Sequence, residues 1–378
     1  MKKQGKSYLK YVAVAALSFV MLFAAGCSEE SNEPKAGELP IGSIADYMSP
    51  KADTFYEYEG IGNELAAWKI YYDYIHEGES YQRRIYSGEA QTAEVLVLSE
   101  DRLTLTFGFP NYAINYDLST ISKYQDAIII KTPIEKGNKW TRMTLDQTTT
   151  TGESVRYTET AEITEVHKSV TVPYGTFDAI EIRVTNSDDS TEKFEYFVNG
   201  LGFIKAEYVL GTERVSTELA SITEGFTLEQ EVGFFFPAEN DEGGYGLDYE
   251  VRSISLKTNT DMTKLLEDEL KKASAESGNT PILPAGVTIN SYIIDPFNSI
   301  CRVDFSANYP ELLSKDPAME GALMMAMVNT LSSYSGMERV AINVEGAGYE
   351  SANFSFGKHD YQTPLVPEVS EGEGEDVE

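Results

Sequence analysis

The sequence predicts a two-domain protein: an N-terminal antiparallel β domain, formed by a curved sheet or half-barrel, and a C-terminal α/β domain with two main helices. The chain has 378 residues, more than one typical domain. Hydrophobic residues make up 42% of it, and its 24 Tyr and 17 Phe favour β-structure. Short alternating runs fill the first half, whereas strands and helices alternate in the second half.

Residues 1–26 have the pattern of a signal peptide. Four lysines precede a mostly apolar stretch from Tyr11 to Ala25, which is short for a membrane-spanning helix. The run Phe-Ala-Ala-Gly-Cys that ends at Cys27 resembles the bacterial lipobox, although Ala24 stands where Leu is commonest. This resemblance implies cleavage before Cys27 and a diacylglyceryl group on its sulfur, with acyl chains such as palmitate. The alternative is an ordinary secretory signal that happens to contain a cysteine.

A polar segment follows Cys27, and an acidic segment lies at the C-terminal end of the sequence. We expect residues 27–51 to form a flexible tether and residues 368–378 a disordered acidic tail. Removal of residues 1–26 takes the net charge from −31 to −35, which argues against nucleic acid and anionic lipid surfaces as partners. The sequence therefore predicts an extracytoplasmic protein on the outer face of the bacterial cytoplasmic membrane, attached through acyl chains.

Residues 52–224 are expected to form the β-rich domain. Turn residues such as Lys136-Gly137-Asn138 and Asn199-Gly200 separate its short runs, and convincing helical periodicity is lacking. A further turn is expected at Glu59-Gly60. The predicted strands are Trp68–Ile75, Ala93–Leu98, Leu103–Phe107, Ala127–Ile130, Val155–Val166, Ser169–Val172, Ala179–Val184 and Phe194–Val198.

Part of this domain resembles a known module. The turn Val-Pro-Tyr-Gly-Thr-Phe at residues 172–177 and the run Tyr-Phe-Val-Asn-Gly-Leu-Gly-Phe-Ile-Lys at residues 196–205 are similar to motifs of LolA/LolB-like half-barrel lipoproteins. The resemblance covers about residues 130–210. It implies an incomplete barrel with a concave face, which holds lipid in some relatives. The alternative is that these Gly and Phe residues only shape a sheet.

Residues 230–367 are expected to form the α/β domain, because strands and helical periodicity alternate there. A first helix opens at Thr260 or Asp261, and a second runs from its N-cap, Asp316, to just before Gly336. The predicted strands are Val232–Phe236, Tyr249–Leu256, Val287–Ile294, Ile300–Phe305 and Val340–Val344.

The order of these elements resembles the GerMN domain of bacterial sporulation, germination and envelope proteins. The matching pieces are Phe234–Pro237, Leu283–Val287, Arg302–Ser306, Val328–Leu331 and Val340–Gly346. The resemblance implies an accessory or assembly protein that docks with another envelope or membrane protein, or with itself. One departure is that the germination protein looks like a tandem of two such domains, whereas one copy is visible here.

The sequence offers little material for catalysis. His76, His167 and His359 are scattered and lack metal-site spacing, and nucleophile-elbow and phosphate-loop motifs are absent. We therefore expect no metal, cofactor or catalytic residue. Cys301 is interpreted as a buried small residue rather than a reactive thiol. The segments 186–189 and 240–244 carry oxygen ligands for calcium, yet neither has EF-hand spacing.

Two surfaces could contact a ligand or a partner. The strand Tyr71-Tyr72-Asp73-Tyr74 would suit sugar stacking if one face were exposed, with packing inside a sheet as the alternative. On the second helix, Met324, Met325 and Val328 flank the stripe that should pack on the sheet, and we expect them to form a docking surface. The competing interpretation is that both flanks of this helix are buried.

These observations predict a non-enzymatic, membrane-anchored lipoprotein whose GerMN-like domain serves protein docking or envelope or sporulation-type assembly. The alternative is a lipoprotein that binds lipid or cell-wall glycan in its β-rich half-barrel. A glycan-cleaving enzyme is a third possibility, because acidic residues are abundant, but no pair of them is singled out by the sequence.

Overall fold

The structure is a computed structural model that describes residues 42–88, 90–110, 112, 116–121, 126–146, 155–186, 192–240, 243–275, 280–313 and 316–365. Across these ranges a large antiparallel sheet is followed by a region with a mixed sheet and three α-helices. The predicted fold class is therefore confirmed. The last strand of the large sheet ends at Glu224, and the next strand begins at Leu228.

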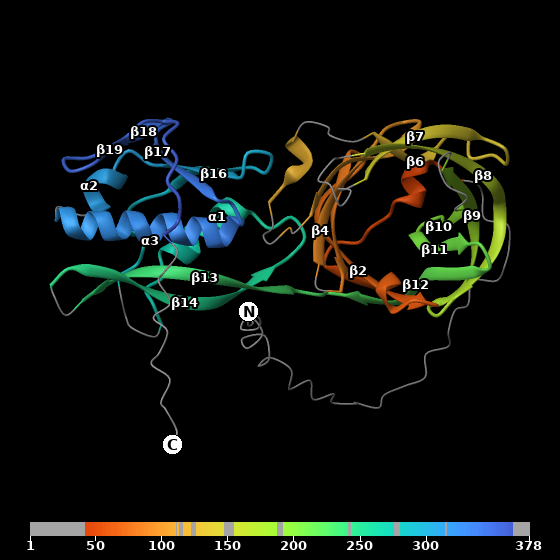
Figure 1. The fold of residues 1–378 in the computed structure, drawn as a ribbon, viewed down its shortest axis with the longest axis horizontal. Coiled ribbons are helices and arrows are strands. Elements are labelled where there is room, and N and C mark those ends of the chain that lie inside the picture. The colour runs from red at the N-terminus through yellow and green to blue at the C-terminus, as the bar shows by residue number, and fades with distance from the viewer. Residues whose placement is uncertain are drawn as a thin grey trace, which may run out of the picture. The chain divides into compact units, whose positions relative to one another are not determined.

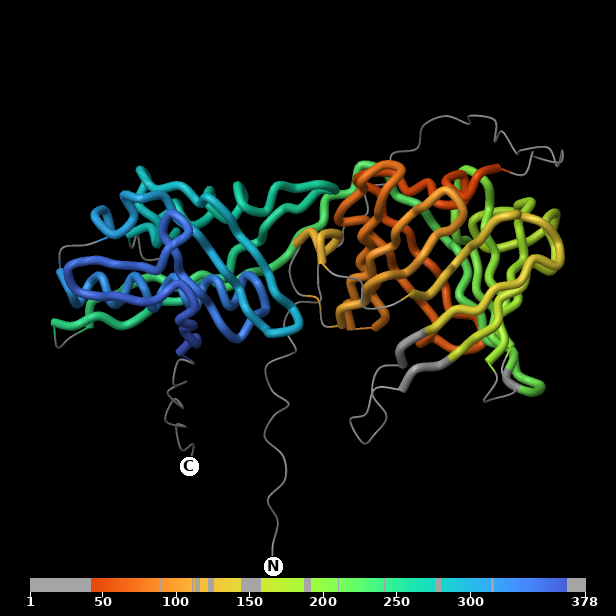
Figure 2. The backbone as a smooth tube through the Cα atoms, turned by 90° about the horizontal axis from the view of Figure 1, so that it is seen from above, coloured from red at the N-terminus to blue at the C-terminus, as the bar shows by residue number. Residues whose placement is uncertain are grey.

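The large sheet has twelve strands in the order β6-β5-β4-β3-β2-β1-β12-β11-β10-β9-β8-β7 and curves into a nearly closed barrel (Figure 1). Its two halves, residues 54–110 in orange and 155–224 in yellow to green, face each other in Figure 2. The strands are β1 Thr54–Ile61, β2 Trp68–His76, β3 Ser80–Ser87, β4 Ala90–Leu98, β5 Arg102–Pro110, β6 Ala127–Lys131, β7 Lys139–Asp146, β8 Val155–Val172, β9 Gly175–Asn186, β10 Glu192–Val198, β11 Gly202–Leu210 and β12 Glu213–Glu224. Two 3₁₀ turns, η2 Glu64–Ala66 and η3 Leu118–Thr120, lie between strands.

The barrel is closed where its two edge strands, β6 and β7, approach each other. The indole Nε1 of Trp140 on β7 donates a hydrogen bond to the Ile128 carbonyl on β6 at 2.9 Å, and Asp126 forms an isolated antiparallel bridge with Met143. Because an unpaired edge strand invites association with other chains, this contact between the edges protects the sheet.

All eight strands predicted for this region lie within observed strands, and the two predicted over residues 155–172 form one strand, β8. Strands β1, β3, β7, β11 and β12 are not among those eight. In β3 and β7 the reason is physical, because charged residues interrupt the apolar alternation that signals a strand. The turn expected at Glu59-Gly60 is wrong, since both residues belong to β1. Gly60 is required there because a Cβ would collide with the carbonyl oxygen of Asn63.

The segment before β1 also differs from the expectation. Within the predicted tether, Ile44–Tyr47 form a 3₁₀ turn, η1, whose Ile44 and Tyr47 are buried together with Met48 in the barrel core. The amide of Gly200 donates to the Asp46 carbonyl oxygen at 2.7 Å and fixes this turn to the loop between β10 and β11. The apolar spacing i, i+3, i+4 explains this packing, because it places the three side chains on one face.

The C-terminal region begins with a long hairpin and continues with a mixed sheet in the order β15-β16-β17-β18-β19, in which β16 and β17 are parallel. Pro237 does not end its strand as expected but pairs with Leu247. A proline is tolerated in a two-stranded hairpin, where one side of each strand lacks a strand partner. The strands are β13 Leu228–Glu239, β14 Tyr245–Leu256, β15 Ile289–Asp295, β16 Ile300–Phe305, β17 Arg339–Val344, β18 Ala347–Glu350 and β19 Ser355–Phe356.

The helices confirm the predicted starts. The Asp261 carboxylate caps α1 (Met262–Leu270), and the Asp316 carboxylate caps α3 (Pro317–Ser335) by accepting from the Ala318 amide at 3.0 Å. Gly336 ends α3 in the left-handed conformation that favours glycine. A short helix that was not predicted, α2 (Tyr309–Leu313), connects β16 to α3.

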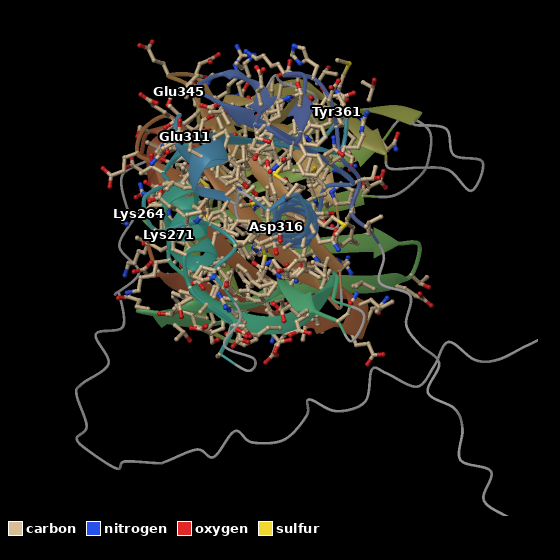
Figure 3. All side chains as sticks on the ribbon, turned by 90° about the vertical axis from the view of Figure 1, so that its left-hand side faces the viewer. Lys264, Lys271, Glu311, Asp316, Glu345 and Tyr361 are labelled. Atoms are coloured by element: carbon tan, nitrogen blue, oxygen red, sulfur yellow. The ribbon has the colours of Figure 1, made fainter. Side chains whose placement is uncertain are left out.

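Helix α3 lies between the hairpin β13–β14 and the mixed sheet (Figure 1). Figure 3 looks towards its N-cap, Asp316, and shows side chains around the helix on all sides. The hydroxyl of Thr330 accepts from the Phe235 amide on β13 at 2.9 Å, and the Asn329 side chain exchanges two hydrogen bonds with the backbone of Leu365. A helix enclosed in this way must be apolar around most of its circumference.

Candidate functional site

A cavity of about 950 Å³ lies inside the barrel, with a lining drawn from strands β1 to β11 and from Met48 to Pro50, the residues that follow η1. Its origin is geometric. About eight strands make a barrel that side chains can just fill, whereas the twelve strands here enclose more space. The volume falls in the range of small-molecule sites, roughly 300–1,000 Å³.

One wall of the cavity is aromatic. The ring of Phe203 on β11 lies 5.5 Å from Tyr58, 6.3 Å from Trp68 and 5.6 Å from Phe197, measured between ring centroids. The hydroxyl of Tyr58 donates to the Phe203 carbonyl oxygen at 3.0 Å, which holds β1 against β11. Burial raises the pKa of the neighbouring Tyr72 to about 12, so its phenol stays neutral at physiological pH.

A partly buried ion pair joins β3 and β4 on the same inner surface. Arg83 and Glu94 are directly opposite in the register of the two strands. The guanidinium donates through Nε at 2.8 Å and through Nη2 at 2.6 Å to the same oxygen, Oε2, of Glu94. Burial lowers the pKa of Arg83, but the Glu94 carboxylate outweighs it and raises that pKa. The guanidinium of Arg83 therefore stays charged inside the barrel.

A second and larger cluster links three strands. Arg142 on β7 donates to Glu159 on β8 at 2.6 Å, and its two terminal nitrogens reach the two oxygens of Glu195 on β10 at 3.2 and 3.4 Å. The Nζ of Lys193 also contacts Glu195, at 2.5 Å. We call Arg142, Glu159, Lys193 and Glu195 the charged quartet. It contains two cations and two carboxylates and bridges strands that are not neighbours in the sheet.

The charge state of the quartet follows from its geometry. Burial alone would raise the pKa of Glu195, but the positive charges of Arg142 and Lys193 outweigh burial and lower it to about 2. Burial lowers the pKa of Arg142, whereas Glu195 and Glu159 raise it. All these shifts favour the ionised forms. Glu195 is therefore a carboxylate at any physiological pH.

The remaining wall is aliphatic. Leu96, Leu103, Leu105, Ala127 and Ile129 line it from strands β4, β5 and β6. The cavity thus combines an aromatic wall, an aliphatic wall and paired charges within one chamber. This arrangement can bind a molecule that offers both apolar faces and hydrogen-bonding groups.

The sequence-predicted docking surface on α3 is not formed as expected. Met324 is 6% exposed and Val328 is 5% exposed, and both belong to the core of the C-terminal region. They are therefore buried rather than available to a partner, because α3 is covered by both the hairpin and the mixed sheet. Met325 is partly exposed. Its proposed contact with a partner stays a prediction.

The other candidates from the sequence are dispersed. Cys27 and residues 368–378 lie outside the described residues, and so do parts of the segments 186–189 and 240–244. Cys301 is fully buried, and burial raises the pKa of its thiol to about 12, as expected for a packing residue. The Nε2 of His76 lies 2.9 Å from the carboxylate of Asp117. The other two histidines, His167 and His359, are distant from His76 in the sequence. Among the described residues, no His, Cys, Asp and Glu group of three or more could hold a metal ion.

The tyrosine-rich strand, Tyr71-Tyr72-Asp73-Tyr74, belongs to β2. Tyr71, Tyr72 and Tyr74 are all buried, so this strand offers no exposed tyrosine face for sugar stacking. Tyr72 packs in the barrel core, whereas Tyr71 and Tyr74 pack with the core of the C-terminal region. Tyr72 nevertheless lines the cavity. The charged cavity residues were missed altogether. The sequence did contain a clue to them. Side chains two positions apart in a strand point to the same face, and Glu195 is two positions from the buried Phe197, as Arg142 is from the buried Trp140.

Part of the chain matches a known protein family. Residues 234–350 match the model of the Germane family, described as sporulation and spore germination. This range extends from β13 to β18. This match agrees with the resemblance to GerMN domains noted in the sequence. No curated protein matches the chain.

Three solved structures are distantly similar. The tandem GerMN domains of the sporulation protein GerM from Bacillus subtilis are 14% identical, with 36% of this chain and 46% of that chain covered and a TM-score of 0.27. The first GerMN domain alone is 17% identical, with coverages of 36% and 98% and a TM-score of 0.26. A candidate lipoprotein from Parabacteroides distasonis is 11% identical, with coverages of 47% and 99% and a TM-score of 0.29. The chain thus spans about half of the tandem structure.

None of the helices in the described ranges is long and apolar enough to cross a bilayer.

The lowered pKa of Glu195 predicts how stability depends on pH. The folded-state value of about 2 lies below the ordinary 4.5, so the stabilisation is complete above about pH 5 and disappears as the pH falls towards 2. We expect Glu195→Gln to reduce the free energy of unfolding by about 3 kcal/mol at pH 7. Urea unfolding at pH 7, 4 and 2.5 measures the difference from wild type, which should shrink with falling pH.

Glu165→Gln is the matched control, because Glu165 pairs with Lys136 on the exposed surface. Its effect should be small at each pH. A Glu195→Gln difference that stays constant from pH 7 to 2.5 would contradict an ionised carboxylate in the quartet.

Proposed function

We propose that this protein is a lipid-anchored, extracytoplasmic bacterial lipoprotein that holds a small ligand in its barrel without transforming it. The observation that carries the proposal is the cavity of about 950 Å³. A chamber of this size lined by aromatic, aliphatic and paired charged groups is typical of a binding site. The N-terminal signal and Cys27 support the anchor, because their order matches a lipobox.

The chemistry of the cavity supports binding over glycan cleavage. A glycosidase needs one carboxyl group that stays protonated near neutral pH so that it can act as the acid. Glu195 has a lowered pKa, and Glu94 and Glu159 each accept from an arginine at 2.6 Å. These three groups are acceptors held by cations, an arrangement that suits orientation of a ligand rather than proton transfer.

Filling the cavity tests the binding role. Thr92 lines the chamber, whereas Thr141 points outwards from β7. Bound ligand stabilises the folded state by about 2.7 kcal/mol at a hundred times its Kd, so a ligand-containing fraction should raise the melting temperature. We expect cell-wall saccharide fragments or lipid extracts to raise it for wild type and for Thr141→Trp, but not for Thr92→Trp. Circular dichroism measures the melting temperature.

Two results would contradict the binding role. Either no fraction changes the melting temperature of wild type, or the fractions shift all three proteins equally.

The anchor is tested at Cys27, which lies outside the described residues. Cys27→Ala removes the sulfur that would carry the acyl chains, and the mature surface, with a net charge of −35 after loss of residues 1–26, would be repelled by anionic lipid. We expect the variant to leave the membrane fraction and to keep an uncleaved signal. Fractionation with immunoblotting measures both. Membrane partition equal to that of wild type would show that the anchor lies elsewhere.

A second role is docking through the Germane domain to an envelope or membrane protein, or to another copy of this chain. The match to a sporulation and spore-germination family supports this role. With Met324 and Val328 in the core, Met325 is the member of the predicted surface that remains partly exposed. Docking at this side would therefore centre on Met325 and its neighbours.

Two matched substitutions separate docking from folding. Val328→Glu places a charge in the core and should cost at least about 3 kcal/mol of stability. Met325→Glu should change stability by less than about 1 kcal/mol and, if this side docks, should abolish a crosslink formed in cells. Thermal melts and crosslinking followed by mass spectrometry provide the two readouts. Unchanged crosslinks for a folded Met325→Glu protein would exclude this side of α3 from docking.

A further inference from the structure

We propose that the barrel ligand is uncharged and rich in hydroxyl groups, with the chemistry of a neutral saccharide. This inference rests on the proposed binding function and specifies its ligand class. Three properties of the cavity carry it: its charge balance, its spare hydrogen-bond donors and its aromatic wall.

The charges that line the cavity are already compensated. Arg83 is matched by Glu94, and the charged quartet contains two cations and two carboxylates. The further acidic lining residue, Glu192, pairs with Arg183. A charged ligand would therefore lose its hydration without gaining an unmatched partner, and a buried unmatched charge is costly. The cavity should discriminate against anions and cations alike.

The charged groups nevertheless retain hydrogen-bonding capacity. A guanidinium has five N–H donors, and Arg142 uses three of them in its bonds to Glu159 and Glu195. Carboxylate oxygens likewise have several lone pairs each. Hydroxyl groups both donate and accept, so a polyol can satisfy paired arginine and glutamate side chains without disturbing their charge balance. An acyl chain against the same groups would leave their remaining donors without water.

The aromatic wall suits a ring. Trp68, Tyr58 and Phe203 form a contiguous surface in which the planes of Trp68 and Phe203 are inclined by 27°. Faces of a sugar ring that carry C–H groups pack on such surfaces, while its hydroxyl edge meets polar side chains. Because the aromatic wall and the charged quartet line the same cavity, one molecule can use both.

The chain contains its own reporter of binding. It has two tryptophans, of which Trp68 lines the cavity and Trp140 is buried at the closure between β6 and β7. In a Trp140→Phe variant of the full chain, tryptophan fluorescence reports on the cavity alone. Calorimetry on the wild-type chain gives the same affinities independently, should the variant be unstable.

Four probes distinguish the ligand classes. Two are disaccharides: N,N′-diacetylchitobiose is neutral, and the similar disaccharide of N-acetylglucosamine and N-acetylmuramic acid carries a carboxylate. The other two are the lipids palmitate and lysophosphatidylcholine. We expect saturable binding of the neutral disaccharide, about tenfold or more tighter than that of the carboxylated one. Palmitate and lysophosphatidylcholine should leave Trp68 fluorescence unchanged.

A charge-altering variant sharpens the test. Glu94→Gln leaves Arg83 without its carboxylate and should improve affinity for the carboxylated disaccharide about tenfold, whereas the surface variant Glu165→Gln should not. Tighter wild-type binding of palmitate, lysophosphatidylcholine or the carboxylated disaccharide than of the neutral one would overturn the ligand class and leave the binding function standing. Binding of none of the four probes would overturn the proposed ligand class, and failure of the melting-temperature test would separately overturn the binding function.

Discussion

The size of the barrel is the constraint on which the rest of the N-terminal domain depends. Twelve strands that curve until their edges meet cannot be filled by side chains of ordinary volume. The domain packs part of its interior, where residues such as Ile163, Ile182 and Leu219 are fully buried, and leaves the remainder as a cavity. Polar groups can persist inside because that space is available to water or to a ligand.

Ion pairs inside the barrel also hold the sheet together. Neighbouring strands are joined by backbone hydrogen bonds, but β7 and β10 are separated in the sheet by β8 and β9. The bonds from Arg142 to Glu195 cross this distance over the concave surface. They favour the curvature that closes the barrel, because a flat sheet would pull these side chains apart. The same residues therefore serve the shape of the barrel and the chemistry of its cavity.

Much of the fold was predictable from the sequence, because short alternating runs and helix caps depend on local physics. Ile300–Phe305 was predicted with the bounds that the structure has, and Asp261, Asp316 and Gly336 delimit helices as expected. Strands β3 and β7 escaped prediction because their arginines break the apolar alternation. Those arginines pair with carboxylates on other strands. Such pairing depends on the tertiary structure, so a local sequence pattern cannot reveal it.

The same limit explains what the sequence alone did not resolve about two surfaces. The stripe on α3 was expected to be one-sided, but the helix is covered by the hairpin as well as by the mixed sheet, so Met324 and Val328 are core residues. A concave face was expected from the resemblance to half-barrel lipoproteins, but the residues that line the cavity were not identified, because no single segment encloses it. Its lining comes from strands β1 to β11, which are brought together only when the barrel closes.

The central claim is that the barrel exists to hold a small molecule. Native mass spectrometry of the protein released from its own membranes tests this claim most directly, by comparing the intact mass before and after denaturation. We expect a bound small molecule, in addition to any covalent lipid, that is lost on denaturation and is absent from Thr92→Trp. A mass that equals the lipidated chain alone under both conditions, in protein shown to be folded, would contradict it.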